Sequence, residues 1–437
     1  MKKQLIVIKT LSCIIIFCFM MCIVNNLLRY LLIDDSSSYT RISMHEMYEQ
    51  DKNIDILFLG SSHSHRSMNT EITDAIFEAN TFGGGTSQQQ LDGSYAVLKE
   101  VGKHNKLSHV YLEMYYDVTS VDISERDELT QTYIIADYMK PSLNKWSLLA
   151  NASTPEYYMN GFIPARRNHN QLFEKDYIKH LFEKKQTEAY QNFEYIDVGY
   201  ERYAGKGYVY HNGVIPENGF LYSAHFTPIQ EEPFSNTTIK YLEKIINYCK
   251  KNQIQLTLYT TPMPNFRLVD MGNYDTYVSC VNQFAQEHGV AYYDFNLCKE
   301  AYLHFDDTDF SDTDHLNGIG AEKFSAFFSE FFTGQINQDA FYHTYEEKLA
   351  DYGDCIFGLL IIPTSYEKDY HIEAVHTGNA KIYYTVQKTA NETDDIVLLQ
   401  ERSDNTDIKL PVDENGTITV TAYLDGSDEV HTVVQNY

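Results

Sequence analysis

Basic residues are scarce in this chain of 437 residues, which has 34 Lys and Arg against 61 Asp and Glu, a formal net charge of −27. A surface this acidic repels nucleic-acid phosphates, so we expect no nucleic-acid partner. The charge of the whole chain also argues against adhesion to anionic lipid by electrostatics alone. Hydrophobic residues make up 43% and charged residues 22%, which excludes a mainly disordered or collagen-like chain.

The sequence also lacks the cysteine patterns of zinc-binding and disulfide-rich proteins. Three of its seven cysteines lie in an apolar N-terminal segment, and the other four are scattered without a C-x-x-C pair: Cys13, Cys18 and Cys22, then Cys249, Cys280, Cys298 and Cys355. This pattern predicts neither a zinc site nor a dense disulfide framework, and it leaves one disulfide among the last four open. We expect no metal and no cofactor.

Long hydrophobic runs are absent except at the N-terminus. Lysines precede a run at 10–28, which has about the 20 residues that a membrane-spanning helix needs. No small-residue cleavage pattern follows it, which favours an uncleaved signal anchor over a cleaved signal peptide. Lysines before the run and Asp34 and Asp35 after it predict that the N-terminus is cytoplasmic. We therefore expect a single-pass protein, held in the cell membrane through residues 10–33, with its catalytic domain outside.

Beyond residue 50, short apolar runs alternate with amphipathic segments. The pattern predicts buried strands at 54–59, 109–114, 254–259 and 290–293, and helices at 88–101, 238–251, 274–288 and 321–332. Such alternation is typical of a parallel sheet with helices on both faces. The expected fold class is α/β, with three layers in the order α/β/α.

The pattern breaks twice along the chain. A polar, Tyr-rich segment at about 115–235 is too long for one strand-to-helix connection, so we expect an insertion that covers the carboxyl edge of the sheet. Short strands then follow at 355–363, 380–387, 395–400 and 416–424, which predict an antiparallel β module. The expected domains are a membrane anchor at 1–37, an α/β domain at 38–337 and a C-terminal β module at 338–437.

Residues capable of serine chemistry lie at three places. Ser62 belongs to a Gly-Ser-Ser-His motif directly after the first strand, where parallel sheets place their ligands. A serine hydroxyl needs a base, and His315 can serve, with Asp312 three residues earlier to orient it. The backbone N–H groups of Ser62 and of Gly85, in a run of three glycines, can stabilise an oxyanion.

These blocks together resemble the SGNH/GDSL hydrolase superfamily over about residues 50–335. Three blocks carry the resemblance: 57–62, with Ser61 replacing the usual Asp, 82–89, and 312–317. The resemblance implies an SGNH-type fold, a Ser62–His315–Asp312 triad, and oxyanion donors at Ser62 and Gly85.

Two departures from the superfamily pattern concern the oxyanion hole. Gly83 stands where the family often has Asn, and the G-x-N-D block, whose Asn completes the hole, is absent. Tyr115, Tyr116 and Asp117 form the only polar cluster near its expected place. Because losing one such donor can cost ~10²–10³ in rate, an alternative stands: an inactive SGNH-like scaffold that binds glycan or a membrane partner.

The anchor combined with these blocks resembles envelope acyl-transfer proteins, such as the teichoic-acid D-alanine transfer protein and alginate O-acetyltransferase-like proteins. This resemblance implies a serine esterase or O-acyltransferase that acts on an envelope polysaccharide or acylated glycan. It also implies a membrane-bound O-acyltransferase as partner. The sequence leaves esterase and transferase both open, because the outcome depends on whether the site excludes water.

Four further side chains are expected to contact substrate. His63 follows the nucleophile, Ser87 follows the glycine run, Thr261 ends a strand at the proposed site, and Arg166 belongs to a rare basic pair suited to an anionic group. Three of them have a structural alternative: a helix cap for His63, a strand end for Thr261 and a salt bridge for Arg166. A third hypothesis for function is a metal-dependent hydrolase whose ligands are His63, His65 and His315.

Overall fold

The computed structural model describes residues 2–126, 129–151, 154–195, 199–215, 220–222, 224–364, 369–378, 380–388, 405–409, 416–424 and 430–436. Its central feature is a five-stranded parallel sheet in the order β2-β1-β3-β7-β8. These strands are β1 Ile56–Leu59, β2 Thr81–Gly83, β3 His109–Glu113, β7 Gln255–Thr260 and β8 Ala291–Asp294. The predicted parallel α/β sheet is confirmed, with strand positions that shift by one or two residues.

Helices cover both faces of this sheet, because successive strand residues point to opposite sides. Leu57 belongs to a buried cluster with Leu98 and Leu242 on one face, whereas Phe58 packs with Tyr111 and Phe328 on the other. The helices that contribute to these layers are α4 Thr70–Phe77, α5 Leu91–His104, α12 Asn236–Asn252, α14 Tyr274–His288 and α15 Gly318–Phe332. The three expected layers are therefore present.

Shorter elements connect these layers. The helices among them are α2 Tyr39–Glu49, α3 Ser62–Ser67, α6 Tyr116–Thr119, α13 Asn265–Met271 and α16 Tyr345–Tyr352. The 3-10 turns are η1 Ile123–Glu125, η2 Pro164–Phe173, η3 Phe295–Leu297, η4 Asp307–Asp309 and η5 Gln338–Ala340.

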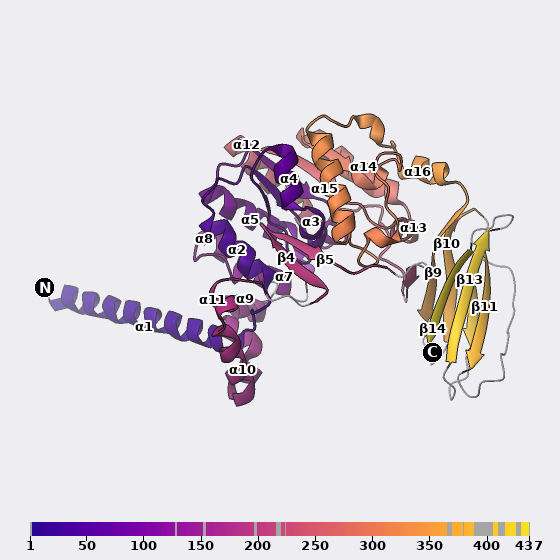
Figure 1. Ribbon diagram of the computed structural model, residues 1–437. Helices are drawn as coiled ribbons and strands as arrows, with labels where there is room; N and C mark the ends of the chain where they lie inside the picture. The colour runs from indigo at the N-terminus through magenta and orange to yellow at the C-terminus, as the bar shows by residue number, and fades with distance from the viewer. Residues whose placement is uncertain are drawn as a thin grey trace.

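The segment between β3 and α12 divides between two places. Its hairpin lies over the carboxyl edge of the sheet, where the N–H of Gly83 donates to the carbonyl of Lys206 (2.8 Å). Its helices Thr130–Ala136 and Leu143–Leu149 pack beside α5, whereas the following ones gather around the end of the N-terminal helix (Figure 1). The elements are α7 Thr130–Ala136, α8 Leu143–Leu149, α9 Pro155–Phe162, α10 Lys175–Lys185, α11 Glu188–Gln191, β4 Glu201–Gly205, β5 Tyr208–His211 and β6 Phe220–Tyr222.

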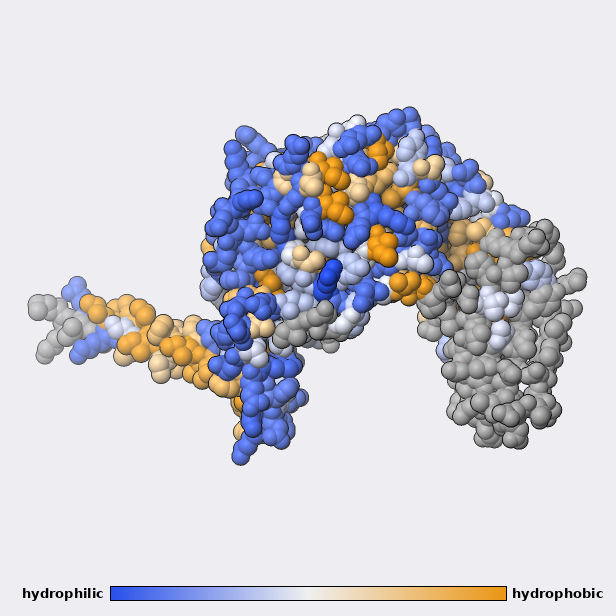
Figure 2. All heavy atoms as spheres, viewed as in Figure 1, coloured by the Kyte–Doolittle hydropathy of each residue, from blue (hydrophilic) through white to orange (hydrophobic). Residues whose placement is uncertain are grey.

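The N-terminal helix α1, Lys2–Leu32, projects from the rest of the protein with its apolar side chains exposed (Figures 1 and 2). Its stretch Ile6–Leu32 is long and apolar enough to cross a membrane. That length and composition suit a membrane anchor and a signal sequence equally.

The C-terminal strands form two antiparallel groups at the far end from α1 (Figure 1). One sheet has the order β12-β10-β9-β6 and includes the short strand β6, which pairs in parallel with β9; the other has the order β11-β13-β14. The strands are β9 Cys355–Pro363, β10 Asp369–Thr377, β11 Ala380–Lys388, β12 Asn405–Lys409, β13 Gly416–Leu424 and β14 Val430–Asn436. The predicted β module is confirmed, although β10, β12 and β14 were not predicted and the strand expected at 395–400 lies outside the described residues. The domain boundaries at 37 and 337 stay predictions.

Candidate active site

The turn after β1 presents Ser62 at the carboxyl edge of the sheet. Gly60 has a φ of 153°, and a Cβ there would lie 2.5 Å from the Cβ of Glu113, so only glycine fits. Ser61 then caps α3 by accepting a hydrogen bond from the N–H of His63 (3.3 Å). Ser62 is the first residue of that helix, and its position follows from the glycine turn and the serine cap.

Ser62, His315 and Asp312 form a hydrogen-bonded row, although the first two are 253 residues apart. The Oγ of Ser62 lies 2.7 Å from Nε2 of His315, and Nδ1 of His315 lies 2.9 Å from Oδ1 of Asp312. A carboxylate accepts from Nδ1–H, which leaves Nε2 as an acceptor for the serine hydroxyl. The structure therefore brings together the three residues that the sequence predicted as a triad, in the order that proton transfer requires.

The Asp312 carboxylate is held in place by the turn that carries His315. Its Oδ1 also accepts from the backbone N–H groups of Asp314 and His315, both at 2.9 Å. Burial alone would raise the pKa of Asp312, but the hydrogen bond and charge of His315, with help from Arg66, hold it below its ordinary value. Asp312 is therefore ionised throughout the neutral range.

Among the described residues, the backbone N–H groups of Ser62 and Gly85 donate no hydrogen bond. A Cβ on Gly85 would lie 2.9 Å from the carbonyl oxygen of Ser61 and 3.2 Å from the Cβ of Ser64. The backbone at Gly85 therefore lies directly against the nucleophile turn. This arrangement suits a two-donor oxyanion hole.

A second Asp–His pair lies beside the triad, and the sequence did not predict it. The His63 ring stacks on the His315 ring with centroids 4.6 Å apart, and its Nε2 lies 3.2 Å from Oδ1 of Asp314. Arg267, from α13, contacts the same oxygen with its Nε at 3.2 Å. Asp314 could have been noticed in the sequence, because it follows Asp312 by two residues. No motif near Arg267 indicates that it belongs to the site.

Burial and charge act in opposite directions on this pair. Burial would raise the pKa of Asp314, but His63, Arg267 and His315 outweigh it and hold the pKa below its ordinary value. Burial lowers the pKa of His63, and Asp314 opposes this only in part. The pair therefore combines an ionised carboxylate with an imidazole that resists protonation.

Candidate metal ligands in this cluster are His63, Asp314 and His315, whose ligand atoms lie within 4.8 Å of one another. His65, which the metal hypothesis included, is not among them; its buried ring lies against Tyr39. A cation at this position would meet the Arg267 guanidinium on Asp314, which disfavours it electrostatically.

The polar residues near the expected place of the missing Asn block, Tyr115 and Asp117, are already bonded to other side chains. The Tyr115 hydroxyl lies 2.8 Å from both Asp117 Oδ2 and Asp314 Oδ2, and it accepts from Nη2 of Arg267 at 2.8 Å. Asp117 also pairs with Arg267 at 2.6 Å. These groups bind one another, so they hold the Asp314 side of the site rather than supplying a free third donor.

Glu113, at the end of β3, is a further site residue that sequence reasoning missed. Its buried carboxylate accepts from the backbone N–H (2.9 Å) and the hydroxyl (3.0 Å) of Ser61. It therefore supports the nucleophile turn from below. The sign in the sequence that could have identified Glu113 is an acidic residue at the end of an otherwise mainly apolar strand.

Of the four predicted substrate contacts, only His63 touches the triad. Ser87 lies 2.8 Å from the Tyr39 hydroxyl, next to His65. Thr261 is buried, and its carbonyl accepts from Asn296 (3.1 Å). Arg166 lies in η2 beside α1 and donates to Asn160 (3.3 Å). No contact joins these three to the triad within the described part of the chain.

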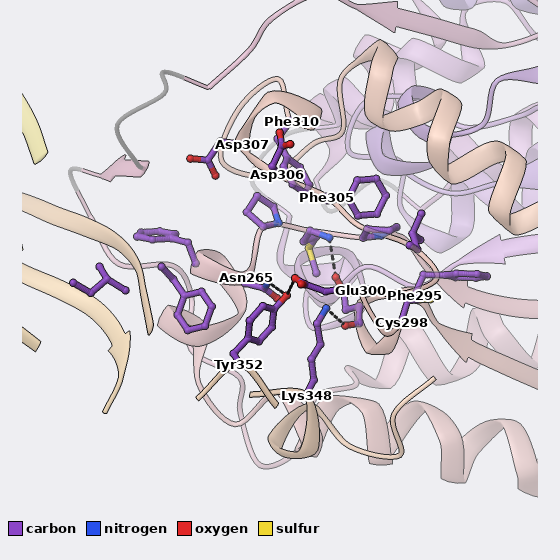
Figure 3. A pocket seen from close by; sticks show the side chains of 18 residues that line it. Asn265, Phe295, Cys298, Glu300, Phe305, Asp306, Asp307, Phe310, Lys348 and Tyr352 are labelled. Carbon is purple, nitrogen blue, oxygen red and sulfur yellow. Dashed lines mark hydrogen bonds between the residues drawn. The ribbon is translucent and has the colours of Figure 1, made fainter. Parts of the chain in front are cut away.

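A separate cavity of about 160 Å³ lies beyond Thr261, between the α/β layers and β9 (Figure 3). Aromatic side chains such as Phe295, Phe305 and Phe310 line one part of it. Lys348, Glu300 and Tyr352 line another part and bind their neighbours. None of the triad residues lines it.

Comparisons with known proteins do not identify this site. No family model and no curated protein matches the chain. A candidate acylhydrolase from Bacteroides fragilis is similar over 67% of this chain and 95% of its own, with 10% identity and a TM-score of 0.30. An engineered protein is similar over 93% of this chain and 98% of its own, with 9% identity and a TM-score of 0.18. Similarities this low support no conclusion about the site. The assignment of the candidate site rests on its geometry.

Proposed function

We propose that the chain is a serine hydrolase or acyltransferase that works through an acyl-Ser62 intermediate. The observation that carries the proposal is the hydrogen-bonded row from Ser62 through His315 to Asp312, next to the N–H groups of Ser62 and Gly85. A nucleophile, a base, an orienting acid and oxyanion donors in one place are the components of acyl transfer.

In the proposed reaction, the Ser62 Oγ attacks the ester carbonyl carbon of an acyl donor while its proton moves to Nε2 of His315. The former carbonyl oxygen carries the negative charge and accepts from the two N–H groups. His315 then gives the proton to the departing alcohol oxygen, which leaves an ester on Ser62. Water or a sugar hydroxyl next attacks the carbonyl carbon of that ester while its proton moves to His315. The bond to Ser62 Oγ then breaks, Ser62 takes the proton back from His315, and an acid or an acylated sugar is released.

The second Asp–His pair suits this cycle electrostatically. When His315 becomes an imidazolium, it lies 2.9 Å from Asp312 and 4.0 Å from Asp314, so two carboxylates stabilise it. Arg267 offsets the remaining charge of Asp314. His63, kept neutral by burial, adds no competing positive charge.

The proposed setting is the outer face of a membrane, with α1 as an uncleaved anchor and the N-terminus in the cytoplasm. The apolar length of α1 and the resemblance to envelope acyl-transfer proteins support this setting. On the same basis we propose an envelope polysaccharide or acylated glycan as substrate and a membrane-bound O-acyltransferase as partner.

The proposal is tested by labelling the full chain, in detergent micelles, with a fluorophosphonate probe that reacts with activated serines. We expect the wild type to be labelled and Ser62→Ala and His315→Ala to lose labelling. The exposed positions Ser279→Ala and His304→Ala serve as matched controls and should label normally. Absence of labelling in folded wild type would refute the activated serine and favour the scaffold alternative.

The ligand cluster of His63, Asp314 and His315 is the specific observation in favour of a metal-dependent hydrolase. That function predicts that chelation abolishes ester hydrolysis and that zinc restores it. The serine mechanism predicts unchanged labelling and hydrolysis after chelation.

A further inference from the structure

The N-terminal helix is longer than a bilayer requires. Its apolar stretch Ile6–Leu32 has 27 residues, which at about 1.5 Å per residue is about 40 Å. The hydrocarbon core of a bilayer is about 30 Å thick and takes about 20 residues. Roughly two helical turns at the C-terminal end therefore extend through the outer headgroup layer, if the helix spans the membrane as proposed.

The chain between α8 and α11 packs on those last turns. The side chain of Asn25 donates to the carbonyl of Phe162 (3.3 Å), and the side chains of Asn168 and Tyr177 donate to the carbonyl of Leu32 (2.8 and 3.0 Å). The Nζ of Lys185 donates to the carbonyl of Ile33 (2.6 Å). These bonds place α9, η2 and α10 beside the end of α1, as Figure 1 shows.

This segment differs in charge from the chain that contains it. Residues 164–186 have six Lys and Arg against three Asp and Glu, whereas the whole chain is strongly acidic. Lys184 and Lys185 pair with Asp34 and Asp35, and Arg167 pairs with Asp137. Lys175 and Lys179 lie exposed on α10, where Lys179 is 3.8 Å from the equally exposed Glu183. Exposed lysines near a membrane surface are attracted to anionic headgroups.

Exposed apolar side chains concentrate in the same region. Among the described residues outside α1, seven of the thirteen large apolar side chains that are exposed lie between positions 143 and 182: Leu143, Trp146, Tyr158, Met159, Leu172, Phe173 and Phe182. Phe173 is 86% exposed and Leu143 is 87% exposed. Burial of such apolar side chains in lipid is favourable, and aromatic side chains favour the membrane interface.

We propose that residues 143–151 and 154–186 form an interfacial surface that lies in the anionic headgroup layer of the membrane that α1 crosses. The exposed basic side chains of Lys175 and Lys179 contact lipid phosphates, and the exposed apolar side chains enter the upper acyl region. This contact adds a second attachment to α1 and holds the α/β layers at one height and orientation above the bilayer. The inference rests on the proposed anchorage but not on the serine chemistry.

The chain contains a single tryptophan, Trp146, which lies inside this surface and stacks on Phe162 with centroids 4.9 Å apart. Its fluorescence therefore reports depth without any added label. The full chain would be placed in vesicles of phosphatidylcholine and phosphatidylglycerol in which the acyl chains carry bromine, a quencher, near the headgroup or near the bilayer centre. We expect Trp146 to lose more fluorescence with the shallow bromines and to be shielded from aqueous iodide.

Two single-tryptophan variants extend the test. In a Trp146→Phe background, Phe173→Trp reports on η2, and Tyr302→Trp reports on an exposed position near the separate cavity. We expect shallow quenching of the first, stronger with phosphatidylglycerol than without it, and none of the second. Circular dichroism of each variant confirms that it is folded.

The outcomes separate the inference from its premise. Failure of the full chain to float with vesicles would overturn the anchorage and this surface together, while leaving serine labelling unaffected. The full chain could instead float with the vesicles while Trp146 and Phe173→Trp are quenched by aqueous iodide and not by bromine. That result would overturn the interfacial surface alone. That second result would leave this region free for a protein partner.

Discussion

Replacing Glu113 by Gln tests how the nucleophile turn is supported. The Glu113 carboxylate is buried and accepts two hydrogen bonds from Ser61, the residue before the nucleophile. A glutamine side-chain oxygen can accept both of these bonds without carrying a charge. The substitution therefore removes the titration of this group while keeping its shape and its contacts.

The magnitude follows from the pKa of the buried carboxyl. Burial, with a smaller contribution from Asp314, raises the pKa of Glu113 from 4.5 to about 7. The folded state then binds the proton more tightly than the unfolded state, so this group stabilises the fold fully below pH 4.5. That stability is lost as pH rises from 4.5 to 7, and the difference amounts to about 3 kcal/mol.

The assay is urea unfolding of the full chain in detergent micelles between pH 4.5 and 7.5. We expect the free energy of unfolding of Glu113→Gln, relative to wild type, to increase by about 3 kcal/mol across this range. The exposed position Glu71→Gln is the matched control and should follow the wild-type profile. Parallel profiles for wild type and Glu113→Gln would refute the reasoning, because the carboxyl would then titrate alike in both states.

Three further predictions concern the same site. Gly85→Ala should slow fluorophosphonate labelling by about 10² and also lower the melting temperature, because the new Cβ would lie 2.9 Å from the Ser61 carbonyl oxygen, so that the backbone must shift and displace one oxyanion donor; labelling at the wild-type rate would contradict this role. Asp312→Asn should slow labelling by about 10³ or more, since an amide cannot stabilise the imidazolium, and rates compared at one pH would show it. Arg267→Met should lower the free energy of unfolding by about 3–5 kcal/mol, because it strips Asp314 of a buried partner; a loss under 1 kcal/mol in urea unfolding would count against this pairing.

The parts of the fold that follow from local pattern were predicted from the sequence. Apolar runs such as 54–59 and 109–114 became parallel strands, because a strand buried on both faces must be apolar at every position. The helix at 274–288 was predicted to the residue, since its apolar spacing and the following Gly289 mark both its length and its end. The elements missed in the C-terminal module are short or half-polar strands whose pairing depends on neighbours distant in the chain.

Candidate residues for the site could also be chosen from the sequence, because a serine after the first strand and a late Asp-x-x-His motif carry their own chemical meaning. The sequence could not supply the rest of the site. Glu113, Asp314 and Arg267 acquire their roles from neighbours at distant positions in the chain, and a buried charge is stable only beside such partners. Likewise, Arg166 and Ser87 were chosen by residue type, and the structure places them beside α1 and Tyr39 instead of the triad.

By itself, the sequence determined the layer pattern, the apolar N-terminal helix and the identity of a plausible nucleophile, base and acid, since periodicity and side-chain chemistry are local properties. Only the tertiary structure decided that Ser62 and His315 meet at 2.7 Å, that a second Asp–His pair lies beside them, and that a basic segment packs on the end of α1. Those features are contacts between distant parts of the chain, and their distances depend on how the layers pack.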